Sequence, residues 1–276
     1  MKTRSITSIF IVLITVAFFF LREIDYRFFD LFVYAIAILC SIELTKAYGE
    51  RLPKLNKIII ISFTAIIFPI AVFFSTYLIL AFSFLIITAI SIVALADKSN
   101  KINKISFTAL ALLYPTLPLL SLVIMNSLAE MWATYLLVMV FAITWLTDVG
   151  AYLVGSWLKG KKLCPSISPN KTVSGAIGGV IFGAIASVAV YFIFSAFKIT
   201  FFADAKTISV VLFLIMTGIL FSISTQIGDL LESVIKRKLG VKDMGNFMPG
   251  HGGMLDRVDG LSITSLLIFV VYSLLL

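Results

Sequence analysis

The segment from residue 233 to residue 259 carries most of the side chains in this sequence that could do chemistry. It reads SVIKRKLGVKDMGNFMPGHGGMLDRVD, within a chain that is otherwise strongly apolar. Lysine and arginine bind phosphate, and aspartate is a suitable ligand for a hard divalent cation. Its five glycines let the backbone turn tightly and approach a ligand closely. This composition indicates chemistry on a phosphorylated substrate.

Two aspartates near the end of the segment are candidate metal ligands. Asp256 and Asp259 are three residues apart at the predicted start of a helix, so their carboxylates share a face. Capping of the helix N-terminus explains one of them but not the pair. We expect the pair to ligate Mg²⁺ or a similar hard ion, with Asp229 as the third ligand. His251 is the only histidine, which excludes a histidine-rich site; it either donates to a phosphate or positions the turn.

The role of the basic residues in the segment has two interpretations. Lys236, Arg237 and Lys238 bind phosphate, or they serve only to orient the chain in a membrane. Arg257 lies between the two aspartates, where it forms a structural ion pair or clamps a phosphate. Upstream, a polar loop contains Ser168, Lys171 and Thr172 just before an apolar run, which is typical either of a phosphate-binding helix N-terminus or of an ordinary helix cap.

Acidic and polar residues also occur inside apolar segments, where they are costly unless they face other helices or a wet cavity. Asp148 shares a helical face with small and polar residues, which leaves room for a ligand, although a buried aspartate bonded to a neighbouring helix explains it too. Asp30 and Glu43 lie near the ends of one segment and can simply reach the interface. The Asp148 face consists of Thr144, Asp148, Ala151, Tyr152 and Gly155. A second polar stripe, at i, i+3/i+4 spacing, consists of Ser222, Gln226, Asp229, Ser233 and Lys236.

The elements that must position these residues are membrane-spanning helices. The chain has 276 residues, is 61% hydrophobic and has a mean hydropathy of +1.11. A bilayer core needs about 20 apolar residues per helix. We therefore predict an all-α, polytopic helical bundle, with five spans in residues 1–130 and a catalytic region in residues 131–276. The nine predicted spans are 6–21, 28–46, 57–74, 77–96, 105–125, 131–157, 173–197, 207–232 and 258–276.

The distribution of basic residues predicts the orientation. With nine spans, 18 of the 22 lysines and arginines fall on one side, which is the cytoplasmic side by the positive-inside rule. The N-terminus and the loops after spans six and eight are then cytoplasmic, as expected for a multi-pass protein of the inner (plasma) membrane. Topogenic lysines and attraction to anionic lipid explain the net charge of +8, and no nucleic-acid binding is expected.

The motifs together resemble the CDP-diglyceride synthase (phosphatidate cytidylyltransferase) family, over about the C-terminal half of the chain. Met248 and Ser174 depart from the residues that are more usual in that family. The main signature is carried by Ser233, Lys236, Arg237, Lys242, Asp243, Gly245, His251, Gly252, Gly253, Asp256, Arg257 and Asp259. The upstream matches are Asp148, Ala151, Tyr152, Gly155, Ser168, Pro169, Lys171, Thr172 and Gly175.

The resemblance implies transfer of CMP from CTP to phosphatidic acid in a homodimeric membrane enzyme that uses Mg²⁺ and a second cation, which a monovalent ion such as K⁺ would satisfy. The expected catalytic residues are Asp229, Lys236, Arg237, His251, Asp256, Arg257 and Asp259. The expected substrate-binding residues are Asp148, Ser168, Lys171, Thr172, Ser233, Lys242, Asp243, Gly252 and Gly253. Alternatives are a CTP-dependent polyprenol kinase, a cytidylyltransferase for an isoprenoid ether lipid and, from another class, a secondary transporter.

Overall fold

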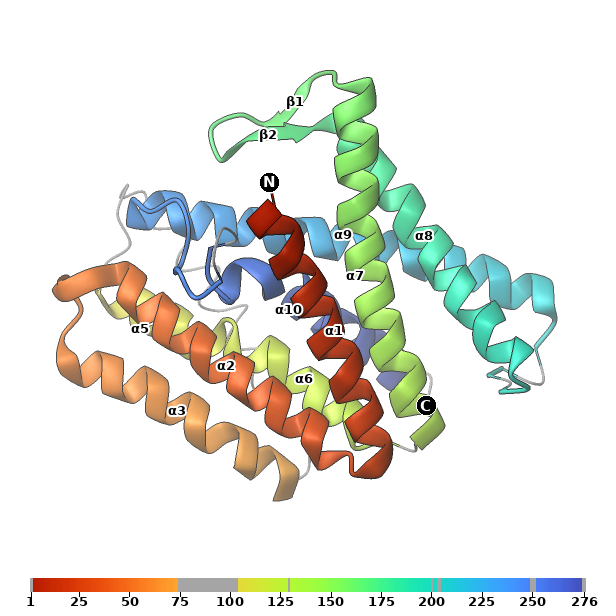
Figure 1. Cartoon of the computed structure of the whole chain (residues 1–276), viewed down its shortest axis with the longest axis horizontal. Coiled ribbons are helices and arrows are strands. Elements are labelled where there is room, and N and C mark those ends of the chain that lie inside the picture. The colour runs from red at the N-terminus through yellow and green to blue at the C-terminus, as the bar shows by residue number, and fades with distance from the viewer. Residues whose placement is uncertain are drawn as a thin grey trace. The chain divides into compact units, whose positions relative to one another are not determined.

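The computed structural model describes residues 2–73, 104–128, 130–199, 201–202, 205–248 and 252–274. The described chain is predominantly α-helical (Figure 1). It divides into two compact units: the first comprises Met1–Ser127 and Ile235–Val258, and the second comprises Leu128–Val234 and Asp259–Leu276. Predicted span 77–96 and His251 lie outside the described residues.

The helices lie where the apolar segments of the sequence predict them. The first unit contains α1 (Lys2–Ile24), α2 (Arg27–Tyr48), the 3₁₀ turn η1 (Gly49–Arg51), α3 (Lys54–Phe73), α5 (Lys104–Leu113) and α6 (Thr116–Asn126). The second contains α7 (Glu130–Leu158), the antiparallel strands β1 (Lys162–Cys164) and β2 (Ser168–Thr172), and α8 (Val173–Ala196). Helices α9 (Thr207–Leu239) and α10 (Leu255–Ser273) contribute residues to both units.

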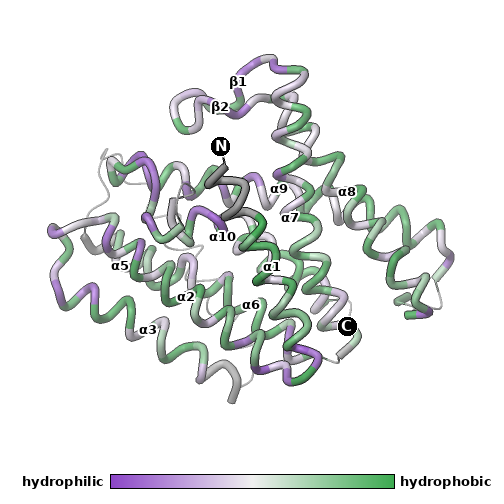
Figure 2. The backbone as a smooth tube through the Cα atoms, viewed as in Figure 1, coloured by the Kyte–Doolittle hydropathy of each residue, from purple (hydrophilic) through white to green (hydrophobic). Residues whose placement is uncertain are grey.

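The membrane character of the chain is confirmed in coarse form. Among the described residues, five helical stretches are long and apolar enough to cross a membrane. The helix bodies are hydrophobic, whereas hydrophilic residues gather on the β1–β2 hairpin and on the segment after α9 (Figure 2). The count of nine spans and the cytoplasmic N-terminus stay predictions. The five stretches are Arg27–Tyr48, Phe107–Asn126, Met131–Leu158, Val173–Ala196 and Thr207–Leu239.

Three local features differ from the sequence prediction. The predicted span 105–125 consists of two helices, α5 and α6, that meet at Tyr114–Pro115, because proline lacks the N–H that would continue the first helix. Helix α9 continues to Leu239, so Lys236 lies in its last turn, where cations interact favourably with the helix dipole. The β1–β2 hairpin was not predicted.

Side-chain hydroxyls hold the helices of the first unit together. The Ser41 and Thr64 hydroxyls are 2.8 Å apart, and the Thr64 and Thr116 hydroxyls are 2.9 Å apart, so a buried chain of hydrogen bonds joins α2, α3 and α6. Asn56 donates to the Thr108 hydroxyl at 2.8 Å and joins α3 to α5. Such bonds satisfy polar groups that cannot form hydrogen bonds with water in apolar surroundings.

Small residues let α7, α8 and α9 approach closely in the second unit. Gly175, Gly179 and Gly183 form a stripe on α8 at four-residue spacing, a pattern that brings helix backbones together. A Cβ atom on Gly183 would lie 2.7 Å from the Thr147 hydroxyl on α7 and 2.6 Å from Ser222 Cβ on α9. Thr147 donates to the Ser222 hydroxyl at 2.9 Å, and Ser222 donates to the carbonyl oxygen of Gly179 at 3.0 Å. The three helices therefore form one tightly packed group.

Candidate active site

A pocket lined by charged, polar and apolar residues lies in the second unit, where α7 and α8 meet the β1–β2 hairpin and α9. Its volume is about 520 Å³. The predicted face of α7 lines the pocket with four of its residues, Asp148, Ala151, Tyr152 and Gly155. Its fifth residue, Thr144, is buried and is not among the lining residues. The other lining residues of the pocket are Ser156, Leu163, Asn170, Lys171, Thr172, Gly175, Ala176, Gln226 and Asp229.

Lys171 of the hairpin lines this pocket. The next residue, Thr172, is the N-cap of α8 and fixes the end of the hairpin. The Thr172 hydroxyl accepts the backbone N–H of Gly175 at 3.1 Å. This bond satisfies one of the first N–H groups of the helix, which have no partner within it. A Cβ atom on Gly155 would lie 3.0 Å from the same hydroxyl, so the close approach of α7 favours glycine there. Thr172 thus forms a helix cap, one of the two interpretations of this loop, and its neighbour Lys171 lines the pocket; substrate binding by Thr172 stays a prediction. Ser168, at the start of β2, pairs with Cys164 and is not among the lining residues.

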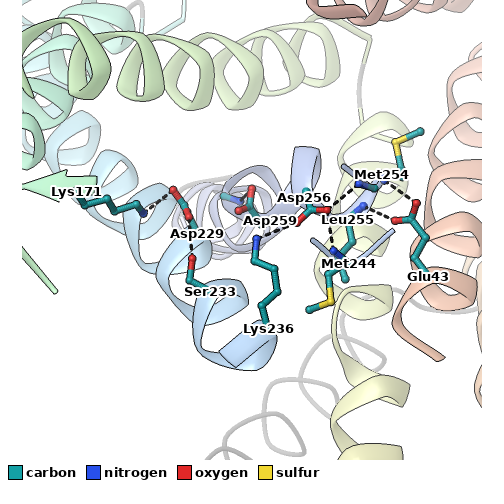
Figure 3. A network of polar contacts seen from close by, with 12 residues as sticks. Glu43, Lys171, Asp229, Ser233, Lys236, Met244, Met254, Leu255, Asp256 and Asp259 are labelled. Carbon is teal, nitrogen blue, oxygen red and sulfur yellow. Dashed lines mark hydrogen bonds and ion pairs between the residues drawn. The ribbon is translucent and has the colours of Figure 1, made fainter. Parts of the chain in front are cut away.

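Lys171 and Asp229 form an ion pair inside the pocket. Figure 3 shows the two side chains directed at each other from β2 and α9. The Lys171 side chain is 25% exposed and that of Asp229 is 36% exposed, so both charges remain accessible to a ligand. The Ser233 hydroxyl donates to Asp229 in a long hydrogen bond of 3.5 Å. The amide of Gln226, one turn earlier on α9, donates to the carbonyl oxygen of Ala176 at 3.1 Å.

Asp259 lies at a close contact between α9 and α10 in the same unit. A Cβ atom on Gly228 would lie 2.6 Å from the carbonyl oxygen of Asp259, and one on Gly260 would lie 3.0 Å from that of Thr225. The two helix backbones therefore touch at this crossing, one residue before Asp229. The Asp259 carboxylate accepts the backbone N–H of Gly260 at 2.8 Å.

The signature segment folds in the first unit around the Asp256 carboxylate (Figure 3). Lys236 Nζ donates to Asp256 Oδ1 at 2.8 Å, and the two side chains are 13% and 4% exposed. Asp256 Oδ2 accepts the backbone N–H of Gly253 at 2.7 Å and that of Met244 at 3.0 Å. The bond back to Gly253, three residues earlier, satisfies a backbone N–H group just before the start of α10.

A residue far away in the sequence completes this arrangement. Glu43 of α2 is buried, and its two carboxylate oxygens accept the backbone N–H groups of Met254 and Leu255. Sequence reasoning missed this role, because it interpreted Glu43 as a side chain that reaches the interface. The available signal was a single glutamate within an apolar helix, which already indicates a specific partner.

The other predicted residues of the segment lie on its surface. Arg237, Lys242, Asp243 and Arg257 are exposed. Gly252 adopts a φ of +82°, and a Cβ atom there would lie 2.8 Å from Asp256 Oδ2, so the position requires glycine for its conformation and for space.

The predicted magnesium ligands are divided between the two units: Asp256 belongs to the first, and Asp229 and Asp259 belong to the second. Among the residues that the structure describes, no three His, Cys, Asp or Glu side chains are placed to hold one ion. Asp256 accepts an ammonium group and two backbone N–H groups, and Asp229 is paired with Lys171. Mg²⁺ binding by Asp229, Asp256 and Asp259 therefore stays a prediction.

Comparisons with known proteins agree with the motifs. A family model described as the cytidylyltransferase family matches residues 2–275. The phosphatidate cytidylyltransferase of Bacillus subtilis (strain 168) is 30% identical over 266 residues, which cover 94% of this chain and 93% of that protein. That of Brucella suis biovar 1 is 42% identical over 134 residues, or 49% of this chain and 45% of that protein. That of Staphylococcus haemolyticus is 46% identical over 119 residues, or 43% of this chain and 42% of that protein.

The matches to the Brucella and Staphylococcus proteins therefore span less than half of those proteins' lengths. The family model and the Bacillus protein, in contrast, align with almost the whole chain. On the strength of these long matches, the chain belongs to the cytidylyltransferase family.

Proposed function

We propose that this protein is a phosphatidate cytidylyltransferase, which transfers CMP from CTP to phosphatidic acid and forms CDP-diacylglycerol and pyrophosphate at the membrane. The observation that carries the proposal is a pocket holding Lys171 and Asp229, in a chain that aligns over 94% of its length with a Bacillus protein of that name. Helices that are long and apolar enough to cross a membrane support a lipid substrate for this chain.

The reaction exchanges one phosphate bond for another. An oxygen of the lipid phosphate attacks the α-phosphorus of CTP, and a new P–O bond forms. The bond from that phosphorus to the oxygen that bridges it to the β-phosphate breaks, and pyrophosphate leaves with the electron pair. The nucleophile is already an anion, so no strong general base is required. Repulsion between two polyanions is then the main obstacle, and cationic groups must reduce it.

Lys171 is the cation that this pocket offers to a phosphate. In this conformation its charge is balanced by Asp229. An incoming phosphate competes with Asp229 for the ammonium group, and the partial exposure of both side chains allows that exchange. The exposed Arg237, Lys242 and Arg257 are further phosphate-binding candidates, whereas Lys236 holds Asp256.

Other parts of the proposal rest on the sequence patterns and on the family resemblance. They are a requirement for Mg²⁺ and a second cation, a homodimer, and a cytoplasm-facing site in the inner membrane. Titration of activity with EDTA and re-addition of Mg²⁺ and K⁺ tests the cation requirement. Light scattering of the purified protein in detergent tests the homodimer.

The pocket assignment is tested by comparing two lysines of the same hairpin. Lys162 lies on β1, is exposed and is not among the pocket-lining residues, so Lys162→Met is a matched control for Lys171→Met. We expect Lys171→Met to reduce formation of CDP-lipid from CTP and phosphatidic acid by about a hundredfold, and Lys162→Met to change it less than about twofold. Equal rates for the two variants would remove the pocket from the reaction.

A further inference from the structure

We propose that Glu43 is a positioning residue of the active site, which holds the signature turn and the start of α10 in place from α2. The signature turn is defined here as residues 244–248 and 252–255. The effect on catalysis rests on the proposed function, whereas the anchoring itself can be measured without any substrate.

Glu43 binds the turn with both oxygens of its carboxylate (Figure 3). Oε1 accepts the backbone N–H of Met254 at 2.9 Å, and Oε2 accepts that of Leu255 at 3.0 Å. These bonds join residues 211 and 212 positions apart in the chain. Hydrogen bonds between a carboxylate and backbone N–H groups are among the stronger ones in proteins.

The turn leaves space for this carboxylate through two glycines. A Cβ atom on Gly245 would lie 2.6 Å from Glu43 Oε1, and one on Gly253 would lie 2.8 Å from the same oxygen. Both distances are shorter than real Cβ contacts, so a side chain at either position would displace Glu43. The absence of a side chain at these two signature positions is therefore needed to leave room for Glu43, which lies outside the signature.

A carboxylate suits this position better than an amide. Helix α10 begins at Leu255, and the first N–H groups of a helix have no partner within it. Asp256 takes the N–H of Gly253, and Glu43 takes those of Met254 and Leu255, so three successive backbone donors point at two anionic groups. An amide side chain has only one acceptor oxygen, and its NH₂ group would face a donor.

The burial of Glu43 also argues for a specific role. The residue is 7% exposed, whereas Glu50, on the 3₁₀ turn that follows α2, is exposed. Removing a carboxylate from water is costly unless hydrogen bonds replace the lost hydration. The anchor replaces them, and it connects α2 to the segment that carries Lys236 and Asp256.

The test compares Glu43→Gln, which preserves volume, with Glu43→Asp, which preserves two acceptor oxygens. Ser41→Ala is the structural control, because it removes a buried hydrogen bond from the same helix without touching the turn. Glu50→Gln is the control for loss of charge. Each variant is assayed for kcat and KM with CTP and phosphatidic acid, and backbone amide exchange at Met254 and Leu255 is measured without substrate.

We expect Glu43→Gln to lower kcat between about tenfold and a hundredfold with little change in KM, because the reacting groups are misplaced. Exchange at Met254 and Leu255 should accelerate in the same variant. Glu43→Asp should retain more activity than Glu43→Gln, although Gln is closer in volume. Ser41→Ala and Glu50→Gln should keep the wild-type kcat.

Two results would overturn the proposal. If exchange at Met254 and Leu255 is unchanged in Glu43→Gln, the anchor does not exist in solution. If exchange accelerates while kcat stays at the wild-type value, the anchor does not position the reaction. An inactive wild-type protein would instead refute the proposed function, and the exchange measurement would still decide the anchoring.

Discussion

Replacing Asp256 by asparagine should destabilise the fold even when no metal is present. Asp256 accepts Lys236 and the N–H groups of Gly253 and Met244, whereas asparagine brings one acceptor oxygen and an NH₂ group into a site made of donors. At 2.8 Å, the gross Coulomb attraction to Lys236 is about 6 kcal/mol for an effective dielectric constant of about 20. Desolvation of the two charges offsets much of this attraction, so the net cost of removing one partner is about 3 kcal/mol.

A double-mutant cycle measures the interaction energy between Lys236 and Asp256 separately from their contacts with the rest of the protein. Asp256→Asn, Lys236→Met and the double variant are unfolded by denaturant in mixed micelles that contain EDTA, and the free energy of unfolding is compared with that of the wild type. Each single change should cost about 3 kcal/mol, because it leaves a buried charge or donor without its partner. The double variant should cost less than the sum by about 2 kcal/mol.

A loss of less than about 0.5 kcal/mol of unfolding free energy for Asp256→Asn in EDTA, the range of ordinary surface substitutions, would contradict a buried ion pair at this position. A loss of stability that appears only when Mg²⁺ is present would favour the metal-ligand interpretation of Asp256. Additive effects of the two single changes would show that Lys236 and Asp256 do not act as a pair.

Three further substitutions test other parts of the account. Gly252→Ala should cost at least about 1–2 kcal/mol of unfolding free energy because of its φ of +82°; an unchanged denaturation midpoint would contradict that backbone conformation. Thr172→Ala should cost about 1 kcal/mol and accelerate amide exchange at Gly175, whereas unchanged exchange would remove the cap. Gly183→Val should cost at least about 1–3 kcal/mol, since its side chain would collide with Thr147; full stability would contradict the close packing of α7 and α8.

Local spacing predicted the parts of the site that lie on single helices. The α7 face with Asp148 and Tyr152 lines the pocket, because residues at three- and four-residue spacing share a helical face whatever the rest of the fold does. The α9 stripe was predicted for the same reason, and Ser222, Gln226 and Asp229 all contact neighbouring elements.

Contacts between distant segments were not predictable from one sequence. Glu43 meets Met254 across 211 positions, and no local pattern encodes such a pairing. The β1–β2 hairpin was missed because its strands are short and polar and carry no alternation of apolar residues. Asp256 was expected to ligate a metal, because its type and spacing fit both ligation and capping; that ligation stays a prediction, and its contacts with Lys236 and the Gly253 N–H were not predictable from spacing.

The most direct test of the proposed function follows the phosphates of CTP. Purified protein in mixed micelles is given phosphatidic acid, Mg²⁺ and CTP labelled at either the α- or the γ-phosphate. We predict that the α-label enters the lipid fraction and that the γ-label leaves in pyrophosphate. A γ-label in the lipid, with the α-label left in aqueous CDP, would contradict the account and identify a lipid kinase.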